Sequence, residues 1–122
     1  MMAADDSGFV YVTGWTKRKT TNVDFVTLKY SPDGELIWQT FYGATGKGDD
    51  KALAVAVDTS HNVYVTGTSA TTSSGLNIVT VKYDSNGIIL WTKSYNGPGN
   101  GEDAPVAIAV NDSQHVYVSG YS

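Results

Sequence analysis

Apolar and polar positions alternate along most of the chain, in short stretches that end at Gly, Asn, Asp or Ser. Such alternation is typical of strands with one buried face. The middle of the chain holds four of these stretches: Ala52–Val57, Val63–Thr68, Asn77–Tyr83 and Ile88–Tyr95. Asp58–Asn62 and Asp84–Gly87 separate them and are short enough for hairpin turns, with Gly87 where a positive φ is needed. The pattern therefore predicts four antiparallel strands.

The same pattern is written more than once. Val-Tyr-Val-Thr-Gly at 10–14 recurs at 63–67 and, with Ser in place of Thr, at 116–120. The offset is 53 each time, since 64 − 11 and 117 − 64 are equal. Without a gap it also pairs Gly34 with Gly87, Trp38 with Trp91, Tyr42 with Tyr95, and Asp50 with Asp103. One register over so many positions indicates a structural repeat.

Four antiparallel strands in a repeat of this length describe one blade of a β-propeller. We therefore expect an all-β fold of β-propeller blades, each a four-stranded antiparallel sheet, with about two blades in the chain. Residues 1–42 are expected to form a first blade lacking most of its first strand. Residues 52–95 form a complete second blade, and 104–122 form the first two strands of a third.

The repeated residues match a known pattern. It consists of Asp-x-Ser-x-x-Val-Tyr-Val-Thr-Gly, the stretch Asp24–Tyr30, the Gly34 turn, Trp38, and Gly-x-Gly-x-Asp before the first strand. It resembles the bacterial SBBP repeat family, which is named for seven-bladed propellers. The resemblance implies a secreted or cell-surface bacterial protein, and a fold rather than a reaction. The chain departs from the family in its number of copies.

The number of copies predicts assembly. A closed propeller has about 4–8 blades, so two blades leave sheet edges that pair with other chains. We expect either a fragment of a longer protein or a homo-oligomer formed through these open blade edges. Counted in order, the strands begin and end with the second strand of a blade. In a closed ring, either the leading or the trailing copy of that strand would be displaced.

Composition and charge exclude several classes of protein. The formal net charge of −4 argues against a nucleic-acid partner, which normally requires a basic patch. The absence of cysteine excludes disulfides and Cys-based zinc sites. There is no run of about 18 apolar residues, so we expect no membrane insertion.

Candidate binding residues lie where the copies differ. Residues 16–23 and 69–76 join the second and third strands of their blades and diverge in sequence, so we expect any protein or glycan ligand at that end. Trp15 could stack on a sugar or pack against a neighbouring loop. The basic cluster Lys17, Arg18 and Lys19 could bind a carboxylate or phosphate, or could be a solvated loop tip.

Two acidic pairs follow Gly-rich stretches: Asp49 with Asp50, and Glu102 with Asp103. Paired carboxylates can act on glycosidic bonds or hold Ca²⁺. Because the pairs recur in register, hydrogen bonding of Asp50 and Asp103 to backbone N–H groups between blades is the favoured interpretation. A single catalytic centre would break the repeat.

The turn Asp58–Asn62 has the alternating oxygens of a Ca²⁺ loop but lacks the closing Glu, so an Asx-type turn is expected. His61 and His115 fall at different repeat positions and are discounted as metal ligands. The sequence contains no nucleophile elbow, Walker loop or dinucleotide fingerprint. We therefore expect a non-catalytic scaffold or protein-interaction module without a cofactor, with a carbohydrate-binding module as the alternative.

Overall fold

The chain is all-β wherever the computed structural model describes it, over residues 1–17, 23–43, 50–71, 75–95 and 104–121. Ten strands are present there: β1 Met2–Ala4, β2 Val10–Lys17, β3 Val23–Tyr30, β4 Leu36–Tyr42, β5 Asp50–Val57, β6 Val63–Thr71, β7 Gly75–Tyr83, β8 Ile89–Tyr95, β9 Ala104–Val110 and β10 Val116–Tyr121. Their β-branched and aromatic residues favour extended backbone. The described residues form no helix that is long and apolar enough to cross a membrane.

The strands form three antiparallel sheets that follow the order of the chain. The first sheet is β1-β2-β3-β4, the second is β5-β6-β7-β8, and the third pairs β9 with β10. The pairing register repeats as well, since Val10 lies opposite Tyr30 in the first sheet and Val63 lies opposite Tyr83 in the second. The predicted four-stranded antiparallel sheet is therefore confirmed for the second copy. In the first copy, which was expected to lack most of its first strand, the three-residue β1 pairs with β2 and completes the sheet, so the strand order begins with a short first strand and not with the second. The third copy contributes two strands.

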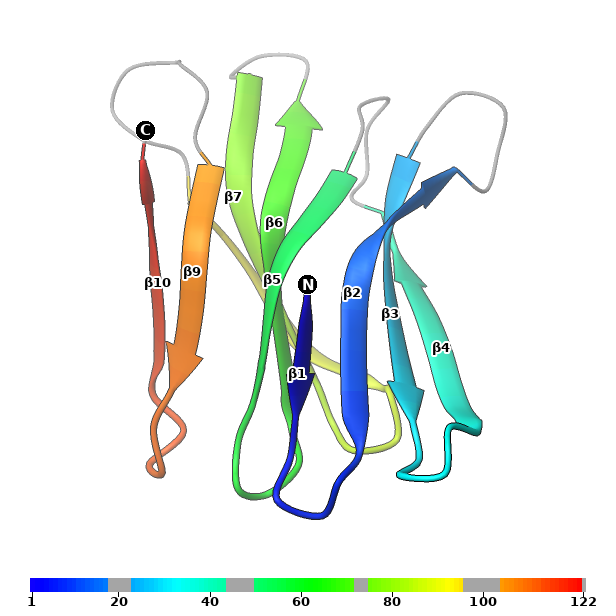
Figure 1. Ribbon diagram of the computed structural model, residues 1–122. Coiled ribbons are helices and arrows are strands. Elements are labelled where there is room, and N and C mark those ends of the chain that lie inside the picture. Colours follow the sequence, from blue (N-terminus) through cyan, green and yellow to red (C-terminus); the bar gives the residue numbers. More distant parts are fainter. Residues whose placement is uncertain (18–22, 44–49, 72–74, 96–103, 122) are drawn as a thin grey trace.

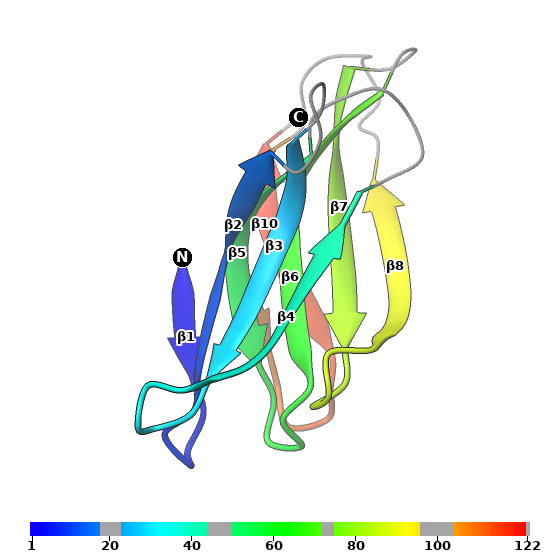
Figure 2. The same ribbon diagram turned by 90° about the vertical axis from the view of Figure 1, so that its right-hand side faces the viewer.

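The three sheets stand side by side, with the second between the other two, and the short hairpin turns gather at one end (Figure 1). Strand β5 contacts β1, β2 and β3, and β9 contacts β5, β6 and β7 one repeat later. Each sheet therefore lies against the preceding sheet in the same way. Figure 2 views the first sheet from its outer side, with the second sheet behind it.

The main core lies between the first and second sheets. Tyr11 and Phe25 of the first sheet are fully buried there. The second sheet contributes seven buried side chains: Ala52, Val55, Val63, Val65, Val79, Val81 and Tyr83. Because side chains alternate between the faces of a strand, the residues flanking Tyr11 lie on the opposite, outer face of the first sheet.

Buried threonine pairs recur within each four-stranded sheet. In the second sheet, Thr66 Oγ1 donates to the carbonyl oxygen of Val79 at 3.1 Å and lies 3.1 Å from Thr80 Oγ1. Thr13 and Thr27 repeat the hydroxyl pair in the first sheet at 3.2 Å. Each hydroxyl thus has a partner, which offsets the cost of burying it.

Left-handed backbone recurs at two positions of the repeat. Gly34 and Gly87 have φ of 86° and 83° in equivalent turns, which confirms the positive φ predicted there. Gly8 has φ of 87°, and its equivalents His61 and Gln114 keep the conformation with φ of 68° and 64°. Non-glycine residues rarely adopt a positive φ, so the turn imposes this backbone conformation on His61 and Gln114.

Candidate functional site

Trp15, the candidate sugar platform, lies near the end of β2 and is 49% exposed. The Nζ atom of Lys51, on β5, lies 5.5 Å from the centroid of its ring. One face of the indole is therefore covered by a cation from the next sheet, a favourable contact. A shallow depression of about 310 Å³ adjoins the pair and is lined by Met1, Thr13, Gly14, Trp15, Ala52 and Leu53.

The charged candidates divide between exposed, buried and undescribed positions. Lys17 is exposed at the end of β2. Asp50 begins β5 and is 2% exposed. The pKa of Tyr42 is raised, first by burial of the Tyr42 hydroxyl and second by the negative charge of Asp50. The remaining candidates lie outside the described residues: Arg18, Lys19, Asp49, Glu102 and Asp103. The expected backbone contacts of Asp50 and Asp103, and their Ca²⁺ alternative, stay predictions.

The predicted Asx turn at Asp58 is confirmed. Asp58 Oδ1 accepts hydrogen bonds from the backbone N–H groups of Ser60 and Asn62, both at 2.9 Å. Asp58 Oδ2 accepts from Asn62 Nδ2 at 3.0 Å and from the Tyr64 hydroxyl at 2.7 Å. Burial raises the pKa of Asp58, but these four donors outweigh burial and hold that pKa below 3.8. The carboxylate therefore fixes the β5–β6 turn.

The same turn is built in the other two copies. Asp5 accepts from the backbone N–H groups of Ser7 and Phe9 and from the Tyr11 hydroxyl, the last at 2.8 Å. In the third copy Asn111 replaces the carboxylate, and its Nδ2 lies 3.3 Å from the Tyr117 hydroxyl. The Asp-x-Ser-x-x-Val-Tyr string thus encodes a turn locked by its own tyrosine. Among described residues no group of three or more His, Cys, Asp or Glu could hold a metal.

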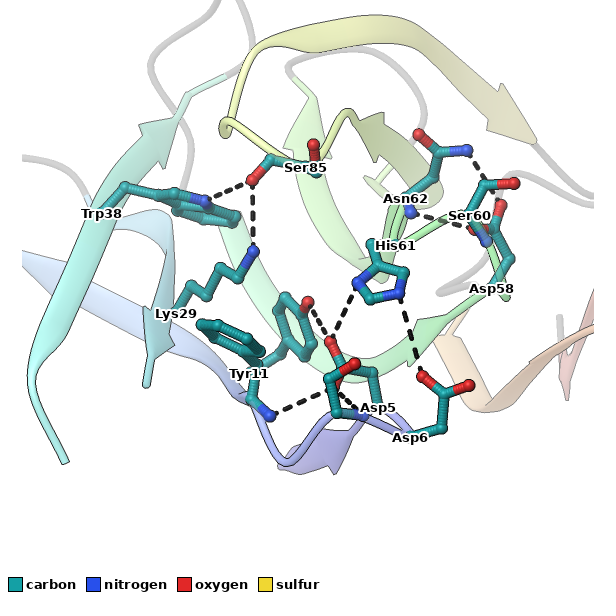
Figure 3. A network of polar contacts seen from close by, with 12 residues as sticks. Asp5, Asp6, Tyr11, Lys29, Trp38, Asp58, Ser60, His61, Asn62 and Ser85 are labelled. Atoms are coloured by element: carbon teal, nitrogen blue, oxygen red, sulfur yellow. Dashed lines mark hydrogen bonds and ion pairs between the residues drawn. The ribbon is translucent and has the colours of Figure 1, made fainter. Parts of the chain in front are cut away.

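His61 joins the turns of the first and second sheets. Its Nδ1 lies 3.3 Å from Asp5 Oδ2, and its Nε2 lies 3.8 Å from Asp6 Oδ1 (Figure 3). Burial raises the pKa of Asp5, whereas the hydrogen bonds from Tyr11, Phe9 and Ser7 and the His61 charge lower it below its ordinary value. His61, which was discounted as a metal ligand, thus contacts the turn of a neighbouring sheet.

Lys29 and Trp38 of the first sheet hold the β7–β8 turn of the second. Trp38 Nε1 donates to the carbonyl oxygen of Ser85 at 3.0 Å, and Lys29 Nζ donates to the same oxygen at 3.4 Å (Figure 3). A Cβ atom on Gly87 would lie 2.9 Å from the Trp38 ring. We call Lys29 and Trp38 the receiving pair, because together they receive a turn from the next sheet.

The same two residue types occur one repeat later, as Lys82 and Trp91, which we call the second receiving pair. Lys82 Nζ lies 3.3 Å from Gln114 Oε1, and the Trp91 ring lies 6.3 Å from the Tyr64 ring. In the described part of the chain, the third sheet has only β9 and β10. The second receiving pair therefore holds no β-turn of the kind that the first pair holds.

A groove of about 400 Å³ lies beside the second receiving pair, between the second and third sheets. It is lined by Ile78, Thr80, Lys93, Ser94, Tyr95, Val118 and Gly120. Tyr95 is 52% exposed, while its equivalent Tyr42 is partly buried against Phe25, with ring centroids 5.5 Å apart. The groove thus occupies the place where, one repeat earlier, β7 and β8 cover the first sheet.

The outer face of the first sheet is apolar and partly exposed. It carries five residues, Val10, Val12, Val26, Leu28 and Tyr30, which we call the first-sheet outer face. Their equivalents in the second sheet are 0–5% exposed, because the first sheet covers them: Val63, Val65, Val79, Val81 and Tyr83. The molecule therefore exposes, at one end, a surface that it buries internally.

Sequence reasoning missed the receiving pairs and the contact of His61 with Asp5. Trp38 recurs as Trp91 in the sequence, but the recurrence does not show which atom the indole contacts, since that atom lies on another sheet. No family model matches this chain, and no curated protein matches it either. The inference of function therefore rests on the geometry.

Proposed function

We propose that the chain is a non-catalytic β-propeller repeat module of the SBBP type, in which each four-stranded sheet is a blade. Its function is to build a scaffold by stacking its blades against further copies of itself. The supporting observation is the first-sheet outer face. Leu28 is partly exposed, whereas its equivalent Val81 is fully buried beneath the neighbouring sheet.

The energetics favour covering that face. Burial of apolar surface contributes about 25 cal/mol per Å², and contiguous exposed apolar patches mark interaction sites or aggregation liabilities. The contacts that a partner would make already exist inside the chain, where the first sheet covers the second. A second copy can supply the same contacts, because every copy carries both surfaces.

The test is the mass of the 122-residue chain in solution. We expect light scattering after size exclusion to report a mass above that of the monomer, and Leu28→Lys to lower it while circular dichroism stays unchanged. Val81→Lys is the matched comparison, and it should unfold the chain because Val81 is fully buried. A folded wild-type chain that remains monomeric at every concentration would contradict the proposal.

Carbohydrate binding is the second candidate, supported by the half-exposed Trp15 beside its shallow depression. A glycan array with the wild-type chain and Trp15→Ala tests it. A signal that Trp15→Ala removes would support binding at this position. Its absence would leave the scaffold, since Lys51 already covers one face of the ring.

A further inference from the structure

The contact between the first and second sheets shows how one blade holds another. The carbonyl oxygen of Ser85 accepts from both members of the receiving pair, Trp38 Nε1 at 3.0 Å and Lys29 Nζ at 3.4 Å. The indole also lies against Gly87, where an added Cβ would approach the ring to 2.9 Å. Two donors and a flat surface thus fix one turn by its backbone.

The two ends of the molecule each carry half of this contact. At one end, Lys82 and Trp91 repeat the receiving pair. At the other end, the β3–β4 turn repeats the β7–β8 turn, with Ser31 N–H and Gly34 N–H bonded within it at 2.8 Å and 2.9 Å. A Cβ on Gly34 would meet nothing within 4 Å, whereas the equivalent position on Gly87 is covered by Trp38.

We propose that Lys82 and Trp91 of one copy bind the β3–β4 turn of a second copy through the carbonyl oxygen of Pro32, with the Trp91 ring over Gly34. Pro32 is the repeat equivalent of Ser85, and the contact needs only its carbonyl group. The interface is head-to-tail, since different surfaces of the two copies meet, and such interfaces close into rings or continue as filaments. This inference rests on the proposed function and adds the direction in which the copies stack, with the second sheet of one copy against the first sheet of the next.

The strands that form the shared sheet follow from burial. For a second copy's β3 and β4 to reach the second receiving pair, its short β1 must leave, and so must either its own β2 or the first copy's β10. Tyr11 on β2 is fully buried, whereas Tyr117 at the same position of β10 is 58% exposed. Displacing β10 therefore loses far less buried surface. The shared sheet consists of β9 of one copy, in the place of the three-residue β1, and β2, β3 and β4 of the next.

The experiment uses one variant for each side of the interface in the full chain. Trp91→Ala removes the indole from the receiving side, and Gly34→Asn adds a side chain where that indole would lie. Asn is chosen because it tolerates positive φ better than most residues. The self-association of each variant alone should be weaker than that of wild type by at least about tenfold, as expected for loss of a central aromatic contact. Mixed together they should form a heterodimer, because each retains one intact surface.

Native mass spectrometry of the two variants, one of them ¹⁵N-labelled, identifies that heterodimer. If wild type associates but Trp91→Ala associates equally well and the mixture contains random pairs, the head-to-tail contact is wrong while self-assembly stands. If wild type never associates, both proposals fail.

Val118→Pro, which disrupts β10 pairing, tests the displacement of β10. The variant should associate as strongly as wild type or more strongly, and weaker association would overturn the displacement of β10. Circular dichroism identifies any variant that unfolds, and Trp91→Phe, which removes the indole N–H and keeps a smaller aromatic ring, then replaces Trp91→Ala.

Discussion

The indole Nε1 of Trp38 donates a 3.0 Å hydrogen bond to the carbonyl oxygen of Ser85, which lies 47 residues further along the chain. This bond joins two sheets that are each complete without it. The bond places the indole against Gly87 of the β7–β8 turn. Trp38 of the first sheet therefore limits which residue the second sheet can have at position 87.

The first prediction compares Gly87→Ala with Gly34→Ala. Both glycines have φ above 80°, so alanine pays the same backbone strain of about 1–2 kcal/mol at each. Only at Gly87 does the added methyl group meet Trp38, at 2.9 Å, which adds about 1–3 kcal/mol of overpacking. Urea unfolding at low protein concentration should therefore show a larger loss for Gly87→Ala. Equal losses would mean that the indole does not press on the turn.

The second prediction concerns Gly67 and its repeat equivalent Gly14. A Cβ on Gly67 would overlap the carbonyl oxygen of Lys51, beside an irregularity of β5 between Ala52 and Ala54. Backbone cannot move aside easily, so Gly67→Ala should cost at least about 3 kcal/mol or prevent folding. Gly14→Ala has open space and should change the urea midpoint little. A strongly destabilised Gly14→Ala chain would contradict this explanation.

The third prediction concerns pH and Asp58. Its pKa is lower in the folded chain than the ordinary 3.8, so its stabilisation is present above that pH and is lost as pH falls through the folded value. Asp58→Asn should lower stability by about 1–3 kcal/mol at neutral pH and by less in acid, since it loses a charged acceptor for Tyr64. Unfolding free energies at about pH 7 and about pH 3 measure the difference.

Asp84→Asn is the control for that experiment. Asp84 Oδ1 accepts from the backbone N–H groups of Asn86 and Ile88, at 2.8 Å and 3.0 Å, and these bonds are exposed. An asparagine oxygen can accept both, as Asn111 does in the third copy. Asp84→Asn should therefore change stability little at either pH. If Asp58→Asn lowers the free energy of unfolding equally at both pH values, the loss comes from the hydrogen bonds of the turn and not from the charge of Asp58.

The fourth prediction concerns the buried threonine pair of the second sheet. Thr66→Val leaves the Thr80 hydroxyl without its partner and should cost about 1–2 kcal/mol. Replacing both threonines by valine removes both hydroxyl groups, so the double variant should lose less than the sum of the two single losses. A double-mutant cycle of unfolding free energies measures this coupling, and strict additivity would argue against it.

Much of the fold was predictable from the chain alone. Alternation, hairpin turns and the 53-residue offset fixed the strand order, and the Asx turn at Asp58 followed from its local sequence. Strand ends shifted slightly, as with β5, which begins at Asp50 rather than Ala52. The candidate site was predicted less well, because the receiving pair acts between sheets and residue spacing does not report which sheets meet.

The clearest division between sequence and tertiary structure is the set Tyr11, Tyr64 and Tyr117. The sequence by itself places each tyrosine after the same turn, in the same strand of its copy, one repeat apart. Only the tertiary structure decides that Tyr11 and Tyr64 are fully buried while Tyr117 is 58% exposed. The reason is physical: local sequence sets backbone conformation through short-range sterics and hydrogen bonds, whereas burial depends on whether another sheet covers that face.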